Sequence, residues 1–473
     1  MQAIDKNTKT HQKRFADCVS ATDCYGFLNL LTSQELLDIV EAQLPKHRER
    51  LYTPTLTLSM FITQILSSDG SCQNTVNAYA VSRAFNGLEP CSTGTGAYCK
   101  ARQHLPLEMV SHVARQTGRM IVEHTPDAWH WRGRCVKLVD GTTITMPDTP
   151  DNQAVYPQQS GQKPGLGFPI ARLVVLICLG SGAVLDAAMG PYKGKATGEH
   201  ALFRQLLGTL EPGDVVLADR YYGSYWLIAL LLAMGVDVVF GQNGARKTDF
   251  RKGTRLGARD HIVEWTKPRV CPDWMEKEQY ENFPETMSIR ETKVAGKVLV
   301  TTLLSSGDTP KSELSNLYKL RWHVELDLRN IKTTLGMEAL RCMTPQMNEK
   351  EMWVYFLGYN LIRLLMCEAA LQAEILPRQI SFKHTLQVWV AWSRHPWEAA
   401  GDEQTALLFV LIAEQRVGNR SGRIEPRAVK KRPKPYPRLM KPRAQAREEI
   451  LKNATLRILS KCHSTKPYSP RSA

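Results

Sequence analysis

The segment from Tyr318 to Lys332 holds the side chains of this chain whose types and spacing are best suited to chemistry. Read as a helix, its period of about 3.6 residues places Arg321, Glu325, Arg329 and Lys332 on one stripe, with Tyr318 one turn earlier. A carboxylate flanked by cations suits a site in which Glu325 holds a metal ion while the cations bind phosphate. The same pattern is also typical of a solvated helix with ordinary ion pairs.

The spacing within this segment is more specific than its charge pattern. Tyr, two residues, Arg, three residues, Glu, six residues and Lys resembles the YREK signature of bacterial insertion-sequence transposases of insertion sequence family four. The resemblance implies a ribonuclease-H-like catalytic domain with an Asp-Asp-Glu triad. A second side of the expected helix is apolar and should pack on a core; it consists of Leu320, Val324, Leu328 and Ile331.

Two short apolar segments each deliver an aspartate. Asp140 follows the predicted strand 135–139, and Asp219 follows the predicted strand 214–218. A buried strand holds a carboxylate rigidly, as a metal site requires. Asp140-Gly141 alone is equally a strong hairpin-turn signal. The predicted order of three antiparallel strands, helix, strand, helix and strand brings the first and fourth strands together. The sequences around both aspartates also resemble the aspartate motifs of the family.

Three carboxylates without a His or Cys cluster favour hard divalent metals, so we expect two ions of Mg²⁺ or Mn²⁺. Asp140 would bridge both ions, and Asp219 and Glu325 would each hold one. The DNA backbone would be bound by a set of mostly basic residues, together with a tryptophan considered below. This set comprises Tyr318, Arg321, Arg329, Lys332 and Arg220.

The fold expected from these patterns is α/β: a ribonuclease-H-like mixed sheet flanked by helices, with a β-rich insertion and helical N-terminal and C-terminal regions. The predicted parts are a helical DNA-binding region 1–130, catalytic segments 131–240 and 299–370, an insertion 241–298, and a helical region 371–473 with a basic arm. The N-terminal assignment rests on short helices and on a resemblance at 97–106; a plain helical bundle is the alternative.

The insertion resembles the β-rich insertion of the family, in which a tryptophan can hold a base flipped out near the cut. Trp265 is the candidate for this role and Trp274 the alternative. Stacking on an indole would offset part of the cost of unstacking the base. Either ring could instead be a structural tryptophan of a small β layer.

The charge balance points to a polyanionic partner. The chain has 61 Lys and Arg against 46 Asp and Glu, a formal charge of +15, which favours nucleic acid over an acidic membrane surface. Its 11 cysteines show no zinc or disulfide spacing, so free thiols in a reducing compartment are expected. The N-terminus is polar, the apolar runs are short, and we expect a cytoplasmic protein. The Pro-rich basic run 430–438 would form an extended arm on DNA or a solubilising tail.

The resemblance implies cut-and-paste transposition. A dimer would bind double-stranded DNA at the terminal inverted repeats, cleave the ends and join them to target DNA. Two alternatives remain open from the sequence: a DNA-binding descendant without catalysis, and a metal-dependent nuclease that cannot join strands.

Overall fold

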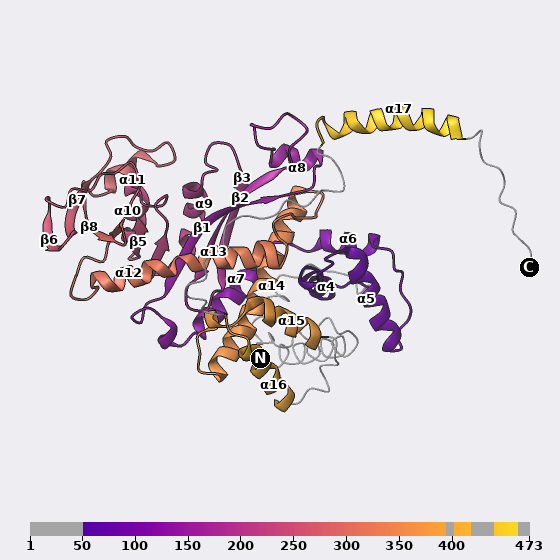
Figure 1. Ribbon diagram of the computed structural model, residues 1–473, viewed down its shortest axis with the longest axis horizontal. Helices are drawn as coiled ribbons and strands as arrows, with labels where there is room; N and C mark the ends of the chain where they lie inside the picture. Colours follow the sequence, from indigo (N-terminus) through magenta and orange to yellow (C-terminus); the bar gives the residue numbers. More distant parts are fainter. Residues whose placement is uncertain (1–50, 394–401, 418–438, 462–473) are drawn as a thin grey trace, which may run out of the picture.

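The centre of the protein is a single mixed β-sheet (Figure 1). The computed structural model describes residues 51–393, 402–417 and 439–461. In these residues nine strands pair in the order β3-β2-β1-β4-β5-β9-β8-β7-β6. The strands are β1 Val136–Thr145, β2 Ile170–Cys178, β3 Val184–Pro191, β4 Val215–Ala218, β5 Asp237–Gly241, β6 Thr254–Gly257, β7 Asp260–Thr266, β8 Thr286–Val294 and β9 Lys297–Thr301.

The first five strands have the predicted topology. β1 and β2 are antiparallel, as are β2 and β3, whereas β4 pairs in parallel with both β1 and β5. The segments that form these strands are rich in Val, Leu and Ile, because strands covered by helices are buried on both faces of the sheet. The sheet is therefore the mixed, helix-flanked type expected of a ribonuclease-H-like domain, and the predicted pairing of the first and fourth strands is confirmed.

The insertion continues this sheet. β9 pairs with β5 on one side and with β8 on the other, and β7 and β6 follow as an antiparallel meander. Figure 1 shows β6, β7 and β8 together at one end of the molecule. The predicted β-rich character is correct, and the strands extend the catalytic sheet through β9.

Helices surround the sheet on both sides. The α-helices are α4 Pro54–Leu66, α5 Cys72–Phe85, α6 Gly96–His104, α7 Leu107–Glu123, α8 Pro150–Val155, α9 Glu199–Gln205, α10 Tyr225–Ala233, α11 Lys277–Asn282, α12 Lys311–Leu320, α13 Trp322–Arg329, α14 Pro345–Gln372, α15 Phe382–Trp392, α16 Asp402–Glu414 and α17 Arg443–Lys461. Short helical turns are η2 Asp127–Trp129, η3 Leu207–Thr209, the π-helical η4 Asn330–Thr334 and η5 Pro377–Gln379. The basic run 430–438 lies outside the described residues.

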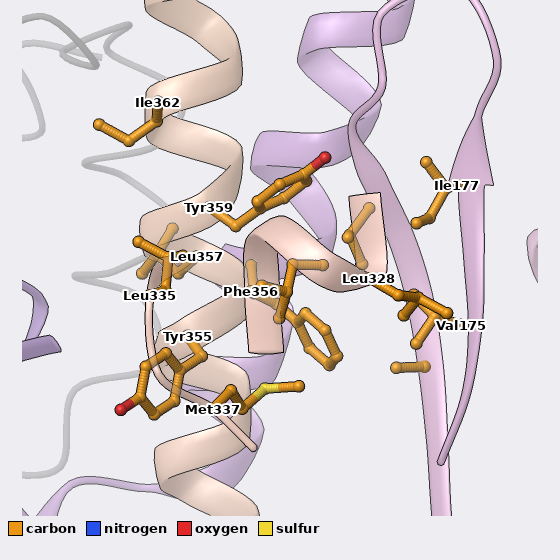
Figure 2. Packing of buried hydrophobic residues seen from close by; sticks show 14 of the residues in the cluster. Val175, Ile177, Leu328, Leu335, Met337, Tyr355, Phe356, Leu357, Tyr359 and Ile362 are labelled. Atoms are coloured by element: carbon orange, nitrogen blue, oxygen red, sulfur yellow. The ribbon is translucent and has the colours of Figure 1, made fainter. Parts of the chain in front are cut away.

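The long helix α14 forms the centre of the largest hydrophobic core. Figure 2 shows Phe356 and Tyr359 of this helix on the side that faces Leu328 of α13, with Val175 and Ile177 of β2 beyond Leu328. By length and composition alone α14 could cross a membrane, but 83% of its most apolar window is buried inside the protein. Its hydrophobicity therefore serves the core, and this apolar segment is longer than the short runs expected from the sequence.

The two faces of the sheet bury different cores, and this alternation fixes where the site residues point. Leu138 and Leu217 belong to the core under α13 and α14, whereas Val139 and Ala218 belong to the core under α9 and α10. Successive residues of a strand point to opposite faces. The residues that follow Val139 and Ala218, which are Asp140 and Asp219, therefore point to the α13 face.

Candidate active site

Asp140 and Asp219 lie at the same level on neighbouring parallel strands. Leu138 of β1 is in register with Leu217 of β4, and continuing that register by two residues places Asp140 beside Asp219. Because the period of a strand is two, both carboxylates share the face of Leu138 and Leu217. That face is the one covered by α13.

The backbone at Asp140 is extended strand. β1 runs through Asp140 and Gly141, which pair with Val175 and Val174 of β2. The alternative reading of Asp140-Gly141 as a hairpin turn is therefore wrong. The local turn preference of Asp-Gly is overridden here by hydrogen bonds along the whole length of β2.

Glu325 projects from α13, which packs against β1. Arg321, one turn earlier, connects the helix to the strand: its Nη2 lies 2.7 Å from Glu325 Oε1 and its Nη1 lies 4.0 Å from Asp140 Oδ2. The helix and the two strands therefore place all three predicted acidic residues in one region. Among the described residues, no three His, Cys, Asp or Glu side chains are already close enough together to ligate a metal ion.

The electrostatics of Asp140 indicate a site short of positive charge. The pKa of Asp140 is raised to about 6, mainly by burial, with the carboxylates of Asp219 and Glu199 acting in the same direction. The Gly141 N–H, which donates to Asp140 Oδ1 at 2.9 Å, and Arg321 act in the opposite direction. Part-buried carboxylates with oxygen donors and too little compensating charge fit a hard divalent cation.

Tyr318 and Lys332 also face this region. A Cβ at Gly241 of β5 would lie 2.8 Å from Tyr318 Oη, so the tyrosine packs closely over the strand only because residue 241 is glycine. Lys332 lies in the π-helical turn η4 and donates to Thr142 Oγ1 of β1 at 3.1 Å. π-helical turns occur frequently at functional sites.

The other predicted DNA-binding cations are accessible. Arg329 and Arg220 are both exposed. The predicted apolar side of the helix is correct at Val324, Leu328 and Ile331, which are buried, but wrong at Leu320, which is 39% exposed. Leu320 is the last residue of α12, and the helix is interrupted at Arg321 before α13 begins, so it does not share the packing of the later residues.

Comparison with known proteins agrees with this geometry. Residues 131–361 match the family model of the transposase DDE domain. The transposase InsG for insertion sequence element IS4 from Escherichia coli K12 is 29% identical over 72% of this chain and 77% of its own length. The putative transposase InsZ of the same organism is 30% identical over 29% of this chain and 46% of its own length. Residues 131–361 are therefore a transposase DDE domain, and these matches support a bacterial DDE transposase of the IS4 type.

The structure of this transposase does not support a base-stacking role for Trp265. The indole is 2% exposed, its Nε1 donates to Glu291 Oε1 at 2.9 Å, and the Arg246 guanidinium lies 3.8 Å from the ring centroid. A base could stack on it only after Arg246 moved away. Trp274 is 39% exposed, but its ring is covered by Arg204, 3.8 Å from the centroid. Trp265 is therefore a buried structural residue of the insertion.

Sequence reasoning missed Glu199, which the fold brings next to Asp140. Glu199 is the first residue of α9, between β3 and β4, and its carboxylate lies against Gly141. An acidic residue in the first turn of a helix is commonplace. The sequence therefore carried no signal that separated Glu199 from an ordinary helix start.

Proposed function

We propose that this transposase carries out cut-and-paste transposition of an insertion sequence. It cleaves double-stranded DNA at the terminal inverted repeats and joins the freed 3′-hydroxyls to target DNA. The observation that supports this proposal best is the placement of Asp140 and Asp219 side by side on parallel strands under the helix that carries Glu325. Binding of two ends by a homodimer is part of the proposal.

In this proposal Asp140, Asp219 and Glu325 hold divalent metal, two ions of Mg²⁺ or Mn²⁺. When bound, the metal supplies activation of the attacking water or hydroxyl and stabilisation of the leaving oxygen. Modest side-chain rotation would be needed, since Glu325 is paired with Arg321 in the structure. The strands and the anchored helix hold the backbone of all three residues in place.

The cations around the triad would position the DNA. Arg321 neutralises Glu325 in this structure and can instead contact a backbone phosphate, which would free the carboxylate. Lys332 and Tyr318 flank the same region and would bind phosphates beside the cut. Exposed Arg329 and Arg220 extend this surface. These contacts orient the phosphodiester and carry no sequence information.

The remaining regions would supply recognition. Residues 1–130 are proposed to read the end sequence, and the C-terminal region 371–473 with its basic arm is proposed to add sequence-independent affinity. The insertion 241–298 extends the sheet that holds the triad and is proposed to support the DNA next to the cut.

The test uses the full chain and a labelled duplex carrying the inverted repeats that flank its gene. With Mg²⁺ we expect nicks at the repeat ends and joined products with a target plasmid, and neither with EDTA. Asp140→Asn, Asp219→Asn and Glu325→Gln should each lose roughly a hundredfold or more in nicking, whereas the exposed control Asp308→Asn should not.

Three results would change the assignment. Nicking without joined products would indicate a simple nuclease. Binding of the repeats without nicking would indicate a DNA-binding descendant. Full activity of Asp140→Asn would show that the catalytic centre lies elsewhere.

A further inference from the structure

We propose that Glu199 is a fourth acidic residue of the catalytic centre, contributing its carboxylate to the divalent cation held by Asp140 and Asp219. This inference rests on the proposed function. It concerns a residue outside the Asp-Asp-Glu triad, which comes from a different helix and the other face of the sheet.

The main observation behind this inference is the close contact between Glu199 and Gly141. A Cβ built on Gly141 would lie 2.3 Å from Glu199 Cδ and 2.6 Å from its Oε1. Any side chain at residue 141 would therefore displace the carboxylate. Because Gly141 has no side chain, it leaves a space on β1 next to Asp140, and the carboxylate of Glu199 occupies that space.

β4 ends before it reaches the level of Gly141 on β1. β4 pairs with β1 only at residues 136–138 and ends at Ala218, so the edge of β1 that faces β4 has no strand partner at Gly141. Asp140 projects toward the α13 face, and Glu199 approaches from the α9 face. Beyond the end of β4, side chains from both faces can reach the same cation.

The surroundings of Glu199 leave its charge largely uncompensated. Tyr222 Oη donates to Glu199 Oε2 at 3.4 Å, a long hydrogen bond. Arg172 is the cation that lowers the pKa of Glu199, but its Nη1 donates to Thr197 O at 2.9 Å and its guanidinium lies over the Tyr192 ring. Within the described residues, no Lys or Arg forms an ion pair with Glu199. A carboxylate beside two others in this state favours a cation over a further hydrogen bond.

The test measures Mn²⁺ binding to the full chain without DNA, by titration calorimetry and by the electron paramagnetic resonance signal of free Mn²⁺. Glu199→Gln should weaken Mn²⁺ binding by roughly 10- to 100-fold, the range typical for residues that support a metal site. Glu211→Gln, at an exposed position in the loop before β4, is the matched control and should bind as the wild type does.

Gly141→Ala is the second variant, and it leaves every charge in place. The added methyl group displaces the Glu199 carboxylate, because the clash is with the end of that side chain, so Mn²⁺ binding should weaken to a similar degree. The double variant Gly141→Ala with Glu199→Gln should bind no more weakly than either single variant. This non-additivity is expected only if both changes act on one interaction.

Asp140→Asn distinguishes the inference from the proposed function. If the wild type binds Mn²⁺, Asp140→Asn loses it and Glu199→Gln retains it, the inference about Glu199 is overturned and the proposed function stands. If the wild type binds no Mn²⁺, or Asp140→Asn binds it normally, both fail. Circular dichroism of each variant checks folding, and if Glu199→Gln unfolds, Gly141→Ala alone decides between the outcomes.

Discussion

Arg321 occupies the position where the helix of the signature meets the first strand. It contacts Glu325 closely and Asp140 at the limit of ion pairing, and it sits at the interruption between α12 and α13. One guanidinium can serve both carboxylates because its donors are spread over a planar fork. This geometry places one cation between two acidic residues of the proposed triad.

Arg321→Gln should therefore impair DNA cleavage more than protein folding. We expect roughly a hundredfold loss in the nicking rate, because both the phosphate contact and the balance of charge at the triad are lost. Arg321→Lys should recover only part of the rate, since an ammonium group cannot form the forked contact. Single-turnover nicking assays and thermal melts measure the two effects, and an unchanged nicking rate in Arg321→Gln would contradict this role.

One variant of Trp265 can test a structural role and a role in DNA contact separately. Trp265→Phe removes the hydrogen bond to Glu291, which is 2% exposed. Arg246 Nε remains as a longer donor to the same oxygen at 3.3 Å, and we expect a loss of about 1–3 kcal/mol in the free energy of unfolding, the typical range for a hydrogen bond to a buried charged group. Urea denaturation measures it, with Trp274→Phe as the control at a partly exposed ring.

The same variant tests base stacking. A 2-aminopurine placed next to the cleavage site reports unstacking by its fluorescence. Because the Trp265 ring is buried under Arg246, Trp265→Phe should give the same fluorescence change as the wild type at a temperature where both are folded. A loss of that signal, with stability unchanged, would restore the stacking role predicted from the sequence.

At the scale of elements, α13 is fixed by a buried ionic network on the side that packs against the core. Asp327, two residues after Glu325, is 1% exposed and accepts hydrogen bonds from Arg363 of α14 and from Arg378 of η5. Arg378 also donates to the carbonyl groups of Cys178 and Leu179 at the end of β2. The helix that carries Glu325 is thereby joined to the core helix and to the sheet.

Asp327→Asn should loosen this attachment. Removing the charge leaves two buried guanidinium groups without their shared partner, which costs about 3–5 kcal/mol in comparable buried pairs. Urea denaturation should show a lower midpoint, and hydrogen exchange should rise in peptides from α13. Asp308→Asn, at an exposed site, is the control. Equal midpoints for Asp327→Asn and the wild type would show that the network does not hold the helix.

These elements also show which features the sequence could predict. Apolar runs and short helical patterns are local, so the strands that carry Asp140 and Asp219 and the helical character of the described part of region 1–130 were predictable. The path of β1 through Asp140-Gly141 was not, because it depends on pairing with β2, distant in sequence. The contact of Glu199 with Gly141 and the ion pairs of Asp327 with Arg363 and Arg378 are likewise long-range contacts. Pattern and spacing do not encode such contacts.

At the scale of the whole molecule, the continuous sheet couples the insertion to the catalytic part. β8 contributes Arg290, which is fully buried and donates to both carboxylate oxygens of Asp260 on β7, at 2.9 and 2.6 Å. The same guanidinium donates to Thr309 O at 2.7 Å, immediately before α12 begins at Lys311. One buried side chain thus joins two strands of the insertion to the segment that leads into the signature helix.

Arg290→Met should disturb both regions together. The substitution leaves Asp260 buried without its partner and frees the Thr309 carbonyl, so we expect about 3–5 kcal/mol of destabilisation. Hydrogen exchange should increase in peptides from β7 and β8 and also in peptides from α12, because the sheet and the Thr309 contact transmit the loss. Lys277→Met, an exposed change on α11, provides the control. Faster exchange confined to β7 and β8, with α12 and nicking unchanged, would mean that the insertion opens as an independent unit despite its place in the sheet.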